Sequence, residues 1–453
     1  MTIWTTRLTG ESGPLYKELA DAIERDIADG KLLPGERLPT HRELADELGM
    51  NVSTVTRGYR EAEKRGLLSG TVGRGTFVAA DAATSTALVS FEPCRPGLIE
   101  MGLVSPLHHM DPDVADGFRR IARRRDPGAF MRYTDPRGLP EHRQAGAQWA
   151  ARYGLETTPE DVIVCAGAQH ALTCTLSGLL RSGDRIATDA LTYPGMKTLA
   201  AMLGIRLVPI AIDEHGMNPD RLDAACRRDK IKGVYLMPGV HNPTTVTMNT
   251  TRRRDIAQLA QKHDLIIIED DAYDLTVPGL EPPVSSFAPE RTVYVAGMSK
   301  SIAAGLRVAF IATPRHMQKD LAQAVLNTIW MAPSLNAELA AIWINDGTAD
   351  RTVEKKRTEA ARRYMIACDI FEDFRFRGKQ SGFYFWLDLP KPWTGKTFEA
   401  AALKAGVNVF GAEKFVVGET PVPAAARVSL TGTDSRKELR KGLMILREIL
   451  EEE

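Results

Sequence analysis

The segment YVAGMSKSIAAGLRVAF, residues 294–310, places a single lysine where a buried strand gives way to a loop. Lys300 follows Ser299, apolar runs flank it on both sides, and Arg307 lies seven residues further on. Apolar surroundings lower the pKa of a lysine and make its amine a nucleophile toward aldehydes. A nearby arginine can neutralise a phosphate. The segment therefore predicts a reactive lysine beside an anion site.

Short apolar runs of the same kind recur from about residue 106 onward and alternate with helical patterns. They are DVIVCAGAQ, RIATDA, LVPIAI, GVYLMP, LIIIEDD, TVYVAG and RVAFIA. Runs that are apolar on both faces are typical of a mostly parallel sheet covered by helices, so the predicted fold class is α/β. Ligands of such sheets bind beyond the carboxyl ends of the strands. Polar residues at those ends are therefore the candidates for a site.

Four of these strand ends carry suggestive residues. Residues 167–169, Gly-Ala-Gln, stand between a strand and a helix, where free backbone N–H groups can cradle a phosphate. Tyr193 offers a ring for stacking, and Asn242 stands in an Asn-Pro turn. Asp270 closes an isoleucine run at the edge of the interior, where a carboxylate needs a partner such as a protonated pyridine nitrogen. Each alone fits a turn or a core residue, but together with Lys300 they describe a site for pyridoxal 5′-phosphate.

The first 78 residues predict a separate small domain. Leu19, Ile23 and Ile27 recur at helical spacing, and Thr40 with Glu43 forms a capping box before a short second helix. NVSTVTRGYREAEKRG restarts at once as a longer helix, which gives a helix-turn-helix, and LLSGTVGRGTFVA then predicts a hairpin or wing. A small helical dimerisation module is the alternative reading.

Short polar side chains at the start of the longer helix suit insertion into a DNA major groove. The formal net charge is zero, so contact with DNA must come from a local basic surface. The predicted DNA-contacting residues are Arg37, Arg42, Asn51, Ser53, Thr54, Thr56, Arg57 and Arg74.

Length and composition bound the remaining possibilities. A chain of 453 residues is too long for one core, and residues 79–105, rich in Ala, Ser and Thr and then in Pro and Gly, read as a tether between domains. The five cysteines show no metal or redox spacing, which predicts a reducing cytoplasm and no metal site. The sequence shows no apolar run of membrane-spanning length and no signal peptide, so we expect no membrane association.

Two family resemblances follow from these motifs. LPGERLPTHRELADELG with STVTRGYREAEKRGLL resembles the winged helix-turn-helix of GntR-type bacterial regulators. Residues 106–453 resemble a fold-type-I, aspartate-aminotransferase-like domain, with a smaller C-terminal subdomain from about residue 346. The whole chain resembles the MocR subfamily of GntR regulators, which implies a cytoplasmic, nucleoid-associated homodimer that binds operator DNA.

The resemblance also implies roles for single residues. Lys300 would form the internal aldimine, Asp270 would pair with the pyridine nitrogen, and Tyr193 would stack on the ring. The other implied roles are ring-hydroxyl contacts for Tyr273 and Asn242, phosphate contacts for Ala168, Gln169, Ser299 and Arg307, a contact of Tyr133 with the neighbouring subunit's phosphate, and binding of an effector carboxylate for Arg427.

The sequence departs from the family pattern at three positions. Val52 stands where many relatives carry a base-reading arginine, which leaves the operator sequence open. Gly297 replaces a common phosphate-binding Ser or Thr, and Thr245 replaces the usual Gly after Asn-Pro-Thr.

Three hypotheses of function remain. The first is a regulator that senses an amino compound by aldimine exchange at Lys300. The second is an aminotransferase with an appended DNA-binding domain. The third is a regulator whose only ligand is pyridoxal phosphate, against which Arg427 argues because an anion-binding arginine implies an amino-acid-like effector.

Overall fold

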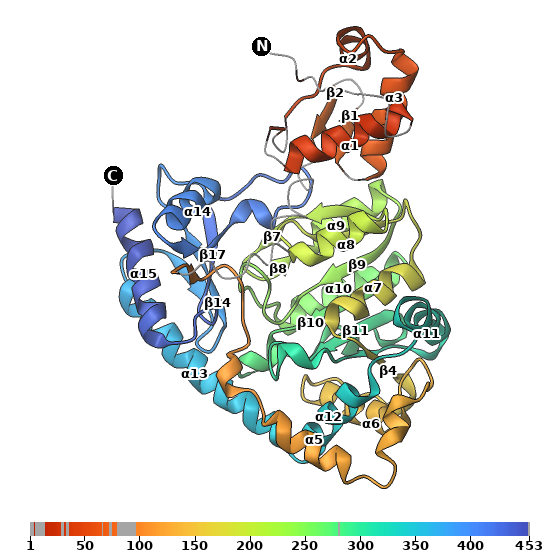
Figure 1. Cartoon of the computed structure of the whole chain (residues 1–453), viewed down its shortest axis with the longest axis vertical. Helices are drawn as coiled ribbons and strands as arrows, with labels where there is room; N and C mark the ends of the chain where they lie inside the picture. Colours follow the sequence, from red (N-terminus) through yellow and green to blue (C-terminus); the bar gives the residue numbers. More distant parts are fainter. Residues whose placement is uncertain are drawn as a thin grey trace.

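The computed structural model describes residue 4 and residues 14–28, 31–32, 36–65, 67–71, 75–78, 97–279 and 281–451. Within these ranges the chain forms a small N-terminal unit, a large unit built on a seven-stranded sheet, and a smaller C-terminal unit (Figure 1). Arg74, residues 79–96 of the predicted tether and Cys94 lie outside the described residues.

The N-terminal unit has the predicted helix-turn-helix and wing. Its elements are α1 (Leu15–Ala28), α2 (His41–Glu47), α3 (Val52–Lys64) and the antiparallel strands β1 (Leu68–Thr71) and β2 (Gly75–Val78). The capping box is present, because Thr40 Oγ1 accepts from the Glu43 amide and Glu43 Oε2 accepts from the Thr40 amide at 2.8 Å. Leu19, Ile23 and Ile27 join one buried cluster with residues of α2, α3 and the wing. This unit thus has a hydrophobic core of its own.

The large unit is built on a mixed sheet in the order β4-β12-β11-β10-β9-β5-β6, in which only β12 runs antiparallel to its neighbours. The strands are β4 (Val162–Cys165), β5 (Arg185–Asp189), β6 (Arg206–Ile210), β9 (Ile231–Leu236), β10 (Ile266–Asp271), β11 (Thr292–Gly297) and β12 (Ala309–Ala312). Each coincides with one of the seven predicted apolar runs, so the predicted α/β class is confirmed.

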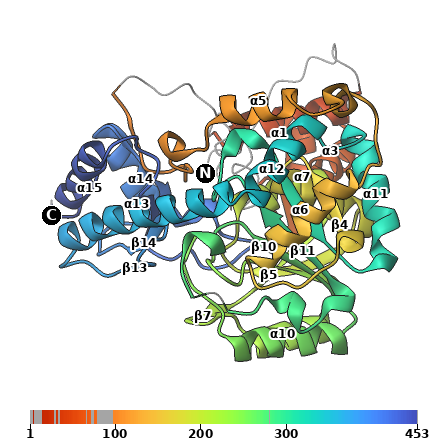
Figure 2. The ribbon, with the colours of Figure 1, turned by 90° about the horizontal axis from the view of Figure 1, so that it is seen from below.

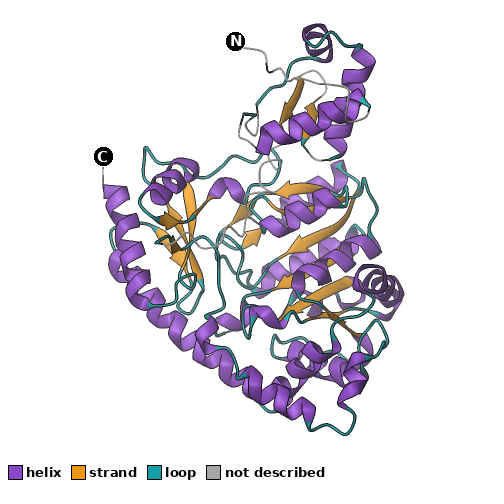
Figure 3. Ribbon diagram, in the orientation of Figure 1, coloured by secondary structure: helices purple, strands orange, loops and turns teal. Residues whose placement is uncertain are grey.

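Helices cover both faces of this sheet (Figure 3). They are α5 (Val114–Ala122), α6 (Pro140–Ala151), α7 (Ala168–Leu179), α8 (Pro194–Met202), α9 (Pro219–Arg228), α10 (Thr250–Lys262), α11 (Arg315–Ile329) and α12 (Ser334–Asn345). Alternate residues of β11 enter different cores: Tyr294 packs with α6 and α12, whereas Val293 and Val295 pack with α7 and α11. A strand buried on both faces therefore has no polar side, as the sequence shows.

The C-terminal unit is a four-stranded antiparallel sheet with helices beside it (Figure 2). Its elements are α13 (Thr348–Ile370), β13 (Phe376–Gly378), β14 (Tyr384–Asp388), α14 (Gly395–Lys404), β15 (Val407–Asn408), β16 (Phe410–Gly411), β17 (Ala425–Ser429) and α15 (Arg436–Glu451). A short hairpin, β7 (Ile212–Asp213) and β8 (Gly216–Met217), extends the large unit.

The last residues of the predicted tether belong to the C-terminal unit. Strand β3 (Ile99–Glu100) pairs in parallel with β15, and Met101 is fully buried in the same core. Within the predicted tether of residues 79–105, Ile99, Glu100 and Met101 therefore belong to the C-terminal unit. Ile99 and Met101 are buried there, whereas the Pro and Gly residues around them in the sequence had indicated a linker.

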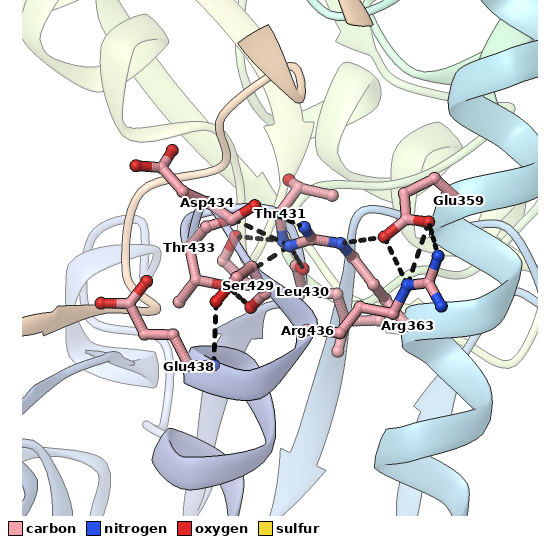
Figure 4. Close-up of polar contacts among 10 residues, drawn as sticks. Glu359, Arg363, Ser429, Leu430, Thr431, Thr433, Asp434, Arg436 and Glu438 are labelled. Atoms are coloured by element: carbon pink, nitrogen blue, oxygen red, sulfur yellow. Dashed lines mark hydrogen bonds and ion pairs between the residues drawn. The ribbon is translucent and has the colours of Figure 1, made fainter. Parts of the chain in front are cut away.

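A network of hydrogen bonds and ion pairs connects α13 to the end of β17 and to α15 (Figure 4). Arg363 on α13 donates to the carbonyl oxygens of Leu430 and Thr433 at 3.1 and 2.9 Å and to Glu359 at 3.0 Å. Glu359 also accepts from Arg436 at the start of α15. Since Arg363 and Glu359 are both buried, α13, α15 and the end of β17 are held as one body.

Among the described residues, no helix combines the length and the hydropathy that crossing a membrane requires.

Candidate functional site

A cavity of about 330 Å³ opens beyond the carboxyl ends of the large sheet and is closed on one side by the C-terminal unit. Ten of the predicted site residues line it: Ala168, Gln169, Tyr193, Asn242, Asp270, Tyr273, Ser299, Lys300, Arg307 and Arg427. These residues come from segments up to 259 positions apart, counted from Ala168 to Arg427. The fold thus brings together what the sequence placed at separate strand ends.

Lys300 lies three residues beyond β11 with its amine inside the cavity. Burial lowers the pKa of the amine to about 8, and the positive charges of Arg427 and Arg307 act in the same direction. The Nζ atom donates to the Val104 carbonyl at 2.6 Å and lies 5.9 Å from the Tyr273 ring centroid. An amine with this pKa is partly neutral at pH 7 and so can act as a nucleophile.

Asp270 presents an unpaired oxygen to the cavity. Its Oδ2 accepts from the Tyr235 hydroxyl at 2.7 Å, while the buried Oδ1 has no hydrogen-bond partner. Burial raises the pKa of this carboxyl to about 6, although the Tyr235 bond acts against the rise. A cationic N–H donor in the cavity would satisfy Oδ1 and favour the ionised form. The adjacent Asp271 is already occupied, because it accepts from the Tyr294 hydroxyl at 2.6 Å.

A cradle for an anion lies between the start of α7 and the loop after Lys300. Gly167 adopts φ of +88°, and a Cβ there would lie 2.3 Å from the Arg307 guanidinium, so only glycine fits. Arg307 itself adopts φ of +51° and donates to Ser299 Oγ at 3.1 Å. The helix N-terminus at Ala168 adds free N–H groups and a positive dipole end. The cradle has the charge and the donors that a phosphate needs.

Aromatic and amide groups flank the space between the cradle and Asp270. The Tyr193 hydroxyl donates to Gln169 Oε1 at 3.2 Å, which orients its ring at the cavity wall. Tyr273 is buried and packs edge-on against Tyr384. Asn242 Oδ1 accepts from Arg427 Nη1 at 2.7 Å. Tyr193, Tyr273 and Asn242 thus all line the cavity.

Two of the departures from the family pattern have visible consequences. Thr245 adopts φ of +61°, a conformation that favours glycine and strains a β-branched residue. Gly297 lines the cavity, and a Cβ there would meet only ordinary contacts, with Ala168 at 3.7 Å. The glycine at 297 is therefore not required sterically, and it leaves room beside the cradle.

Arg427, on β17, carries a buried positive charge that forms no ion pair with a carboxylate among the described residues. Its Nη2 donates to the Gly102 carbonyl at 2.6 Å, and its Nε is buried without a partner. The guanidinium lies 4.9 to 5.5 Å from the ring centroids of Phe415, Phe410 and Tyr384. Burial lowers the pKa of this group. An anion in the cavity would supply the missing countercharge.

Tyr133 lies away from this cavity. Its side chain is 82% exposed, and its ring centroid is 5.5 Å from that of Trp330, which is also exposed. Within one chain it contacts no other predicted site residue in the cavity.

Several residues of the site were not predicted from the sequence. Tyr235 holds Asp270, and the carbonyls of Gly102 and Val104 hold Arg427 and Lys300. Tyr235 reads as one more apolar strand residue, and backbone carbonyls leave no trace in a sequence. Only the position of Tyr235 on the strand beside Asp270 could have indicated its role.

In the N-terminal unit, the start of α3 is exposed and capped. Asn51 Oδ1 accepts from the Ser53 amide at 3.0 Å, and Val52 is 40% exposed. Arg37 and Arg42 are exposed, and Thr54 is half-buried. Arg57 is exposed but packs over the Tyr16 ring at 4.1 Å.

Thr56, a predicted DNA contact, forms a hydrogen bond within α3, and Arg65 forms ion pairs with α1. The Thr56 hydroxyl donates to the Val52 carbonyl at 2.8 Å, so its proton is engaged within α3. Arg65 pairs with Asp21 and Glu24 of α1, away from the start of α3. Arg74 lies outside the described residues.

Comparison with known proteins gives two family matches. The model of the gntR family of bacterial regulatory proteins matches residues 15–78, and that of aminotransferase class I and II matches residues 106–443. The uncharacterized HTH-type transcriptional regulator YdeF of Bacillus subtilis is 37% identical over 450 residues, which cover 99% of this chain and 97% of that protein. The 2-aminoadipate transaminase of Thermus thermophilus is 27% identical over 326 residues, covering 69% of this chain and 80% of that enzyme.

Solved structures agree on the fold. The crystal structure of an archaeal alanine:glyoxylate aminotransferase superposes with a TM-score of 0.74 at 22% identity, covering 87% of this chain and 99% of that one. With a gntR-family helix-turn-helix, an aminotransferase class I and II domain and a full-length HTH-type regulator as relative, this chain belongs to the MocR subfamily of GntR-type regulators.

Proposed function

We propose that this protein is a pyridoxal-phosphate-dependent transcriptional regulator, which binds promoter DNA through its winged helix-turn-helix and senses an amino compound at Lys300. The observation that carries the proposal is the pairing of a lysine of lowered pKa with an unpaired Asp270 oxygen in one cavity. The same chain presents a capped, exposed recognition helix at its other end.

The residues present fit the cofactor. When bound, pyridoxal phosphate supplies an aldehyde that condenses with amines. Arg307, Ser299, Gln169 and the start of α7 would bind its phosphate, and Asp270 would hold a proton on the ring nitrogen. Tyr193 would stack on the ring, with Asn242 and Tyr273 at its hydroxyl. Lys300 would then attach the cofactor after giving up its bond to Val104.

Arg427 defines the class of effector. Its unpartnered Nε suits a negatively charged group, carboxylate or sulfonate, on the amino compound. The aromatic rings around the guanidinium exclude water and so strengthen that interaction. An α-amino acid, an ω-amino acid and an aminosulfonate all satisfy this requirement.

For DNA, the proposal assigns two kinds of contact. Arg37, Arg42, Arg57 and Arg74 would bind phosphates and in part bases, which gives most of the affinity. Asn51, Ser53, Thr54 and Thr56, at the start of α3, would contribute to sequence readout in the major groove. A homodimer, in which Tyr133 reaches the partner's phosphate cradle, would present two such helices to two half-sites.

A true aminotransferase is the second candidate, because ten of the predicted site residues, Lys300 among them, line the cavity and the relatives include a transaminase. The two differ in their products. Adding amino compounds to the cofactor-loaded protein should shift its visible absorbance without release of a keto acid if it is a sensor. Steady keto-acid formation would establish the aminotransferase instead, and indifference to every amine would leave pyridoxal phosphate itself as the signal.

The DNA half of the proposal needs its own test. The full-length protein should bind its own promoter region in an electrophoretic mobility assay, with an affinity that changes when the effective amine is added. Failure of both the full-length protein and residues 1–80 to bind that DNA at low salt would refute the regulator.

A further inference from the structure

Two cysteines and a histidine meet beside the phosphate cradle, where β4 ends and α7 begins. Cys165 is the last residue of β4, and His170 and Cys174 lie on the first turns of α7. One side-chain atom from each lies within 4.8 Å of the others, and both cysteines are buried and free. Sequence spacing gave no sign of this cluster, because a strand end and a helix bring the residues together.

The hydrogen bonds of His170 fix which nitrogen carries its proton. The Ala166 amide donates to Nδ1 at 3.1 Å, so the proton of the neutral ring lies on Nε2. That Nε2 lies 3.2 Å from Cys174 Sγ and 2.8 Å from Thr328 Oγ1. The Thr328 hydroxyl donates to the Ala324 carbonyl at 2.8 Å, so the Nε2 proton faces two acceptors, Thr328 Oγ1 and the Cys174 sulfur. A metal ion on Nε2 would force the proton onto Nδ1, against the Ala166 amide, so the arrangement disfavours a metal.

The two thiols are not equivalent. A hydrogen bond from the Cys165 thiol, helped by His170 and opposed by burial, lowers the pKa of Cys174 to about 5. The same bond and burial raise the pKa of Cys165 well above its ordinary value. Cys174 is thus the more acidic of the two thiols, and the His170 ring lies beside it.

We propose that Cys174 and Cys165 form a hydroperoxide-reactive thiol pair, a modification site separate from the cofactor chemistry. The Cys174 thiolate attacks one peroxide oxygen; the S–O bond forms as the O–O bond breaks, and the departing oxygen takes a proton from water. The Cys165 sulfur then attacks Cys174 Sγ. The S–S bond forms, the S–O bond breaks, and the Cys165 proton leaves with that oxygen as water. Two electrons pass from the sulfurs to the peroxide.

Disulfide formation would act on the phosphate cradle. The Cys165 carbonyl accepts from the Gly167 amide at 2.9 Å, and Cys165 pairs with Ala309 on β12. Drawing the two sulfurs to about 2 Å displaces the strand end that carries Gly167 and faces Arg307. Oxidation should therefore weaken cofactor retention. This consequence rests on the proposed function, whereas the thiol chemistry does not.

A full-length variant with Cys94, Cys226 and Cys368 replaced by serine leaves only the pair. After hydrogen peroxide at pH 6, peptide mapping should find Cys165 linked to Cys174, and dithiothreitol should reverse the link. Adding Cys165→Ser should stop the reaction at a sulfenic acid on Cys174, trapped by dimedone. Adding Cys174→Ser should leave Cys165 unmodified. If the Cys174→Ser variant fails to fold, the Cys165→Ser variant still tests the proposal through the sulfenic acid on Cys174.

The pH dependence gives a second signature in the native protein. The rate of Cys174 modification should change little between pH 8 and pH 6, because the lowered pKa keeps its thiolate present. Burial raises the pKa of Cys226, so the rate of its modification should fall about tenfold for each pH unit. An unmodified Cys174 after Cys226 and Cys368 have reacted overturns the proposal. So does stoichiometric zinc in the purified protein that Cys174→Ser removes. A reversible disulfide with unchanged cofactor retention supports the thiol pair and refutes only its link to the cradle.

Discussion

At the scale of single residues, Lys300 determines what the cavity can do. Its amine is held by the Val104 carbonyl and repelled by two arginines. We predict that Lys300→Ala folds but no longer gives a borohydride-reducible attachment of pyridoxal phosphate. Its response to the effector should be lost, while much of its DNA affinity remains. Absorbance, mass spectrometry after reduction, and a DNA-binding assay measure the three effects.

Lys319→Ala, an exposed lysine on α11, is the matched control and should behave as the wild type. If Lys300→Ala still yields a reduced covalent adduct, another lysine is the site.

The lowered pKa of Lys300 predicts a pH dependence. The neutral amine is the nucleophile, so capture of the cofactor by the apoprotein should rise about tenfold from pH 6 to pH 7 and level off above the pKa of about 8. Arg427→Ala removes a positive charge that lowers this pKa. The pKa must then rise, and the midpoint should move to higher pH. Stopped-flow absorbance measures both curves.

Arg362→Ala, an exposed arginine on α13, should leave the midpoint unchanged. A midpoint near pH 10.5 in the wild type, the ordinary value for lysine, would contradict the buried environment described for Lys300.

The sequence predicted the reactive groups better than the groups that hold them. Asp270 and Asp271 are neighbours whose side chains point to opposite faces of the sheet, because they lie on one strand. One oxygen of Asp270 has no hydrogen-bond partner, whereas Asp271 accepts a hydrogen bond from Tyr294. A rule that polar residues at strand ends form the site finds Asp270. It cannot find Tyr235 or the Val104 carbonyl, because those lie on other segments and look ordinary in the sequence.

At the scale of elements, the recognition helix α3 and the basic residues around it govern DNA binding. Arg42 is exposed on α2, whereas Arg65 is paired with Asp21 and Glu24 of α1. We predict that Arg42→Ala weakens binding to all sequences and lowers the slope of log affinity against log salt by about one. Arg65→Ala should keep that slope. Binding titrations over a range of salt concentrations measure both.

A loss of slope with Arg65→Ala and none with Arg42→Ala would mean that the other face of the N-terminal unit meets DNA.

The elements themselves were largely predictable. Seven apolar runs became seven strands because most of their residues are buried in the sheet, although β6 at the sheet edge is only partly buried. The Thr40 capping box fixed the start of α2. The short strand β3 was not predicted, since two residues carry no periodicity. Its partner β15 lies some three hundred residues away in the sequence, and only tertiary packing selects that pairing.

At the scale of the whole molecule, Tyr133 is the residue that a single chain leaves without a role. It is exposed beside Trp330 and outside the cavity. If it completes the partner's phosphate cradle, Tyr133→Ala and Lys300→Ala should each fail to retain the cofactor normally. Mixed dimers of the two should regain one intact site, because Lys300 of one subunit then meets Tyr133 of the other. Reducible cofactor per dimer after mixing is the measurement.

A monodisperse monomer that binds the cofactor with full affinity, or mixtures that merely average the two variants, would refute the shared site.

The last prediction concerns the coupling of the cavity to DNA. Residues 97–105 follow the segment that leads from the DNA-binding unit, and they supply carbonyls to both key cations. Val104 accepts from Lys300 and Gly102 from Arg427, each at 2.6 Å. An amine that takes the place of Lys300 on the cofactor and offers an anion to Arg427 would change both bonds. It can shift the protein only by its differential affinity for the two arrangements. We therefore predict that Arg427→Ala keeps the cofactor and basal DNA binding but loses the effector's influence.

Reciprocity makes this prediction quantitative. A coupling of about 1–3 kcal/mol corresponds to a change of roughly 5- to 150-fold in DNA affinity, and operator DNA must change effector affinity by the same factor. Titrating the effector with and without operator, followed through the cofactor's absorbance, measures one side, and DNA titrations with and without effector measure the other. In Arg427→Ala both factors should fall to one. Since α13, α15 and the end of β17 form one body, movement of Arg427 would carry the whole C-terminal unit with it. Superimposable effector curves for the wild type with and without operator would show that the two halves of the chain act independently.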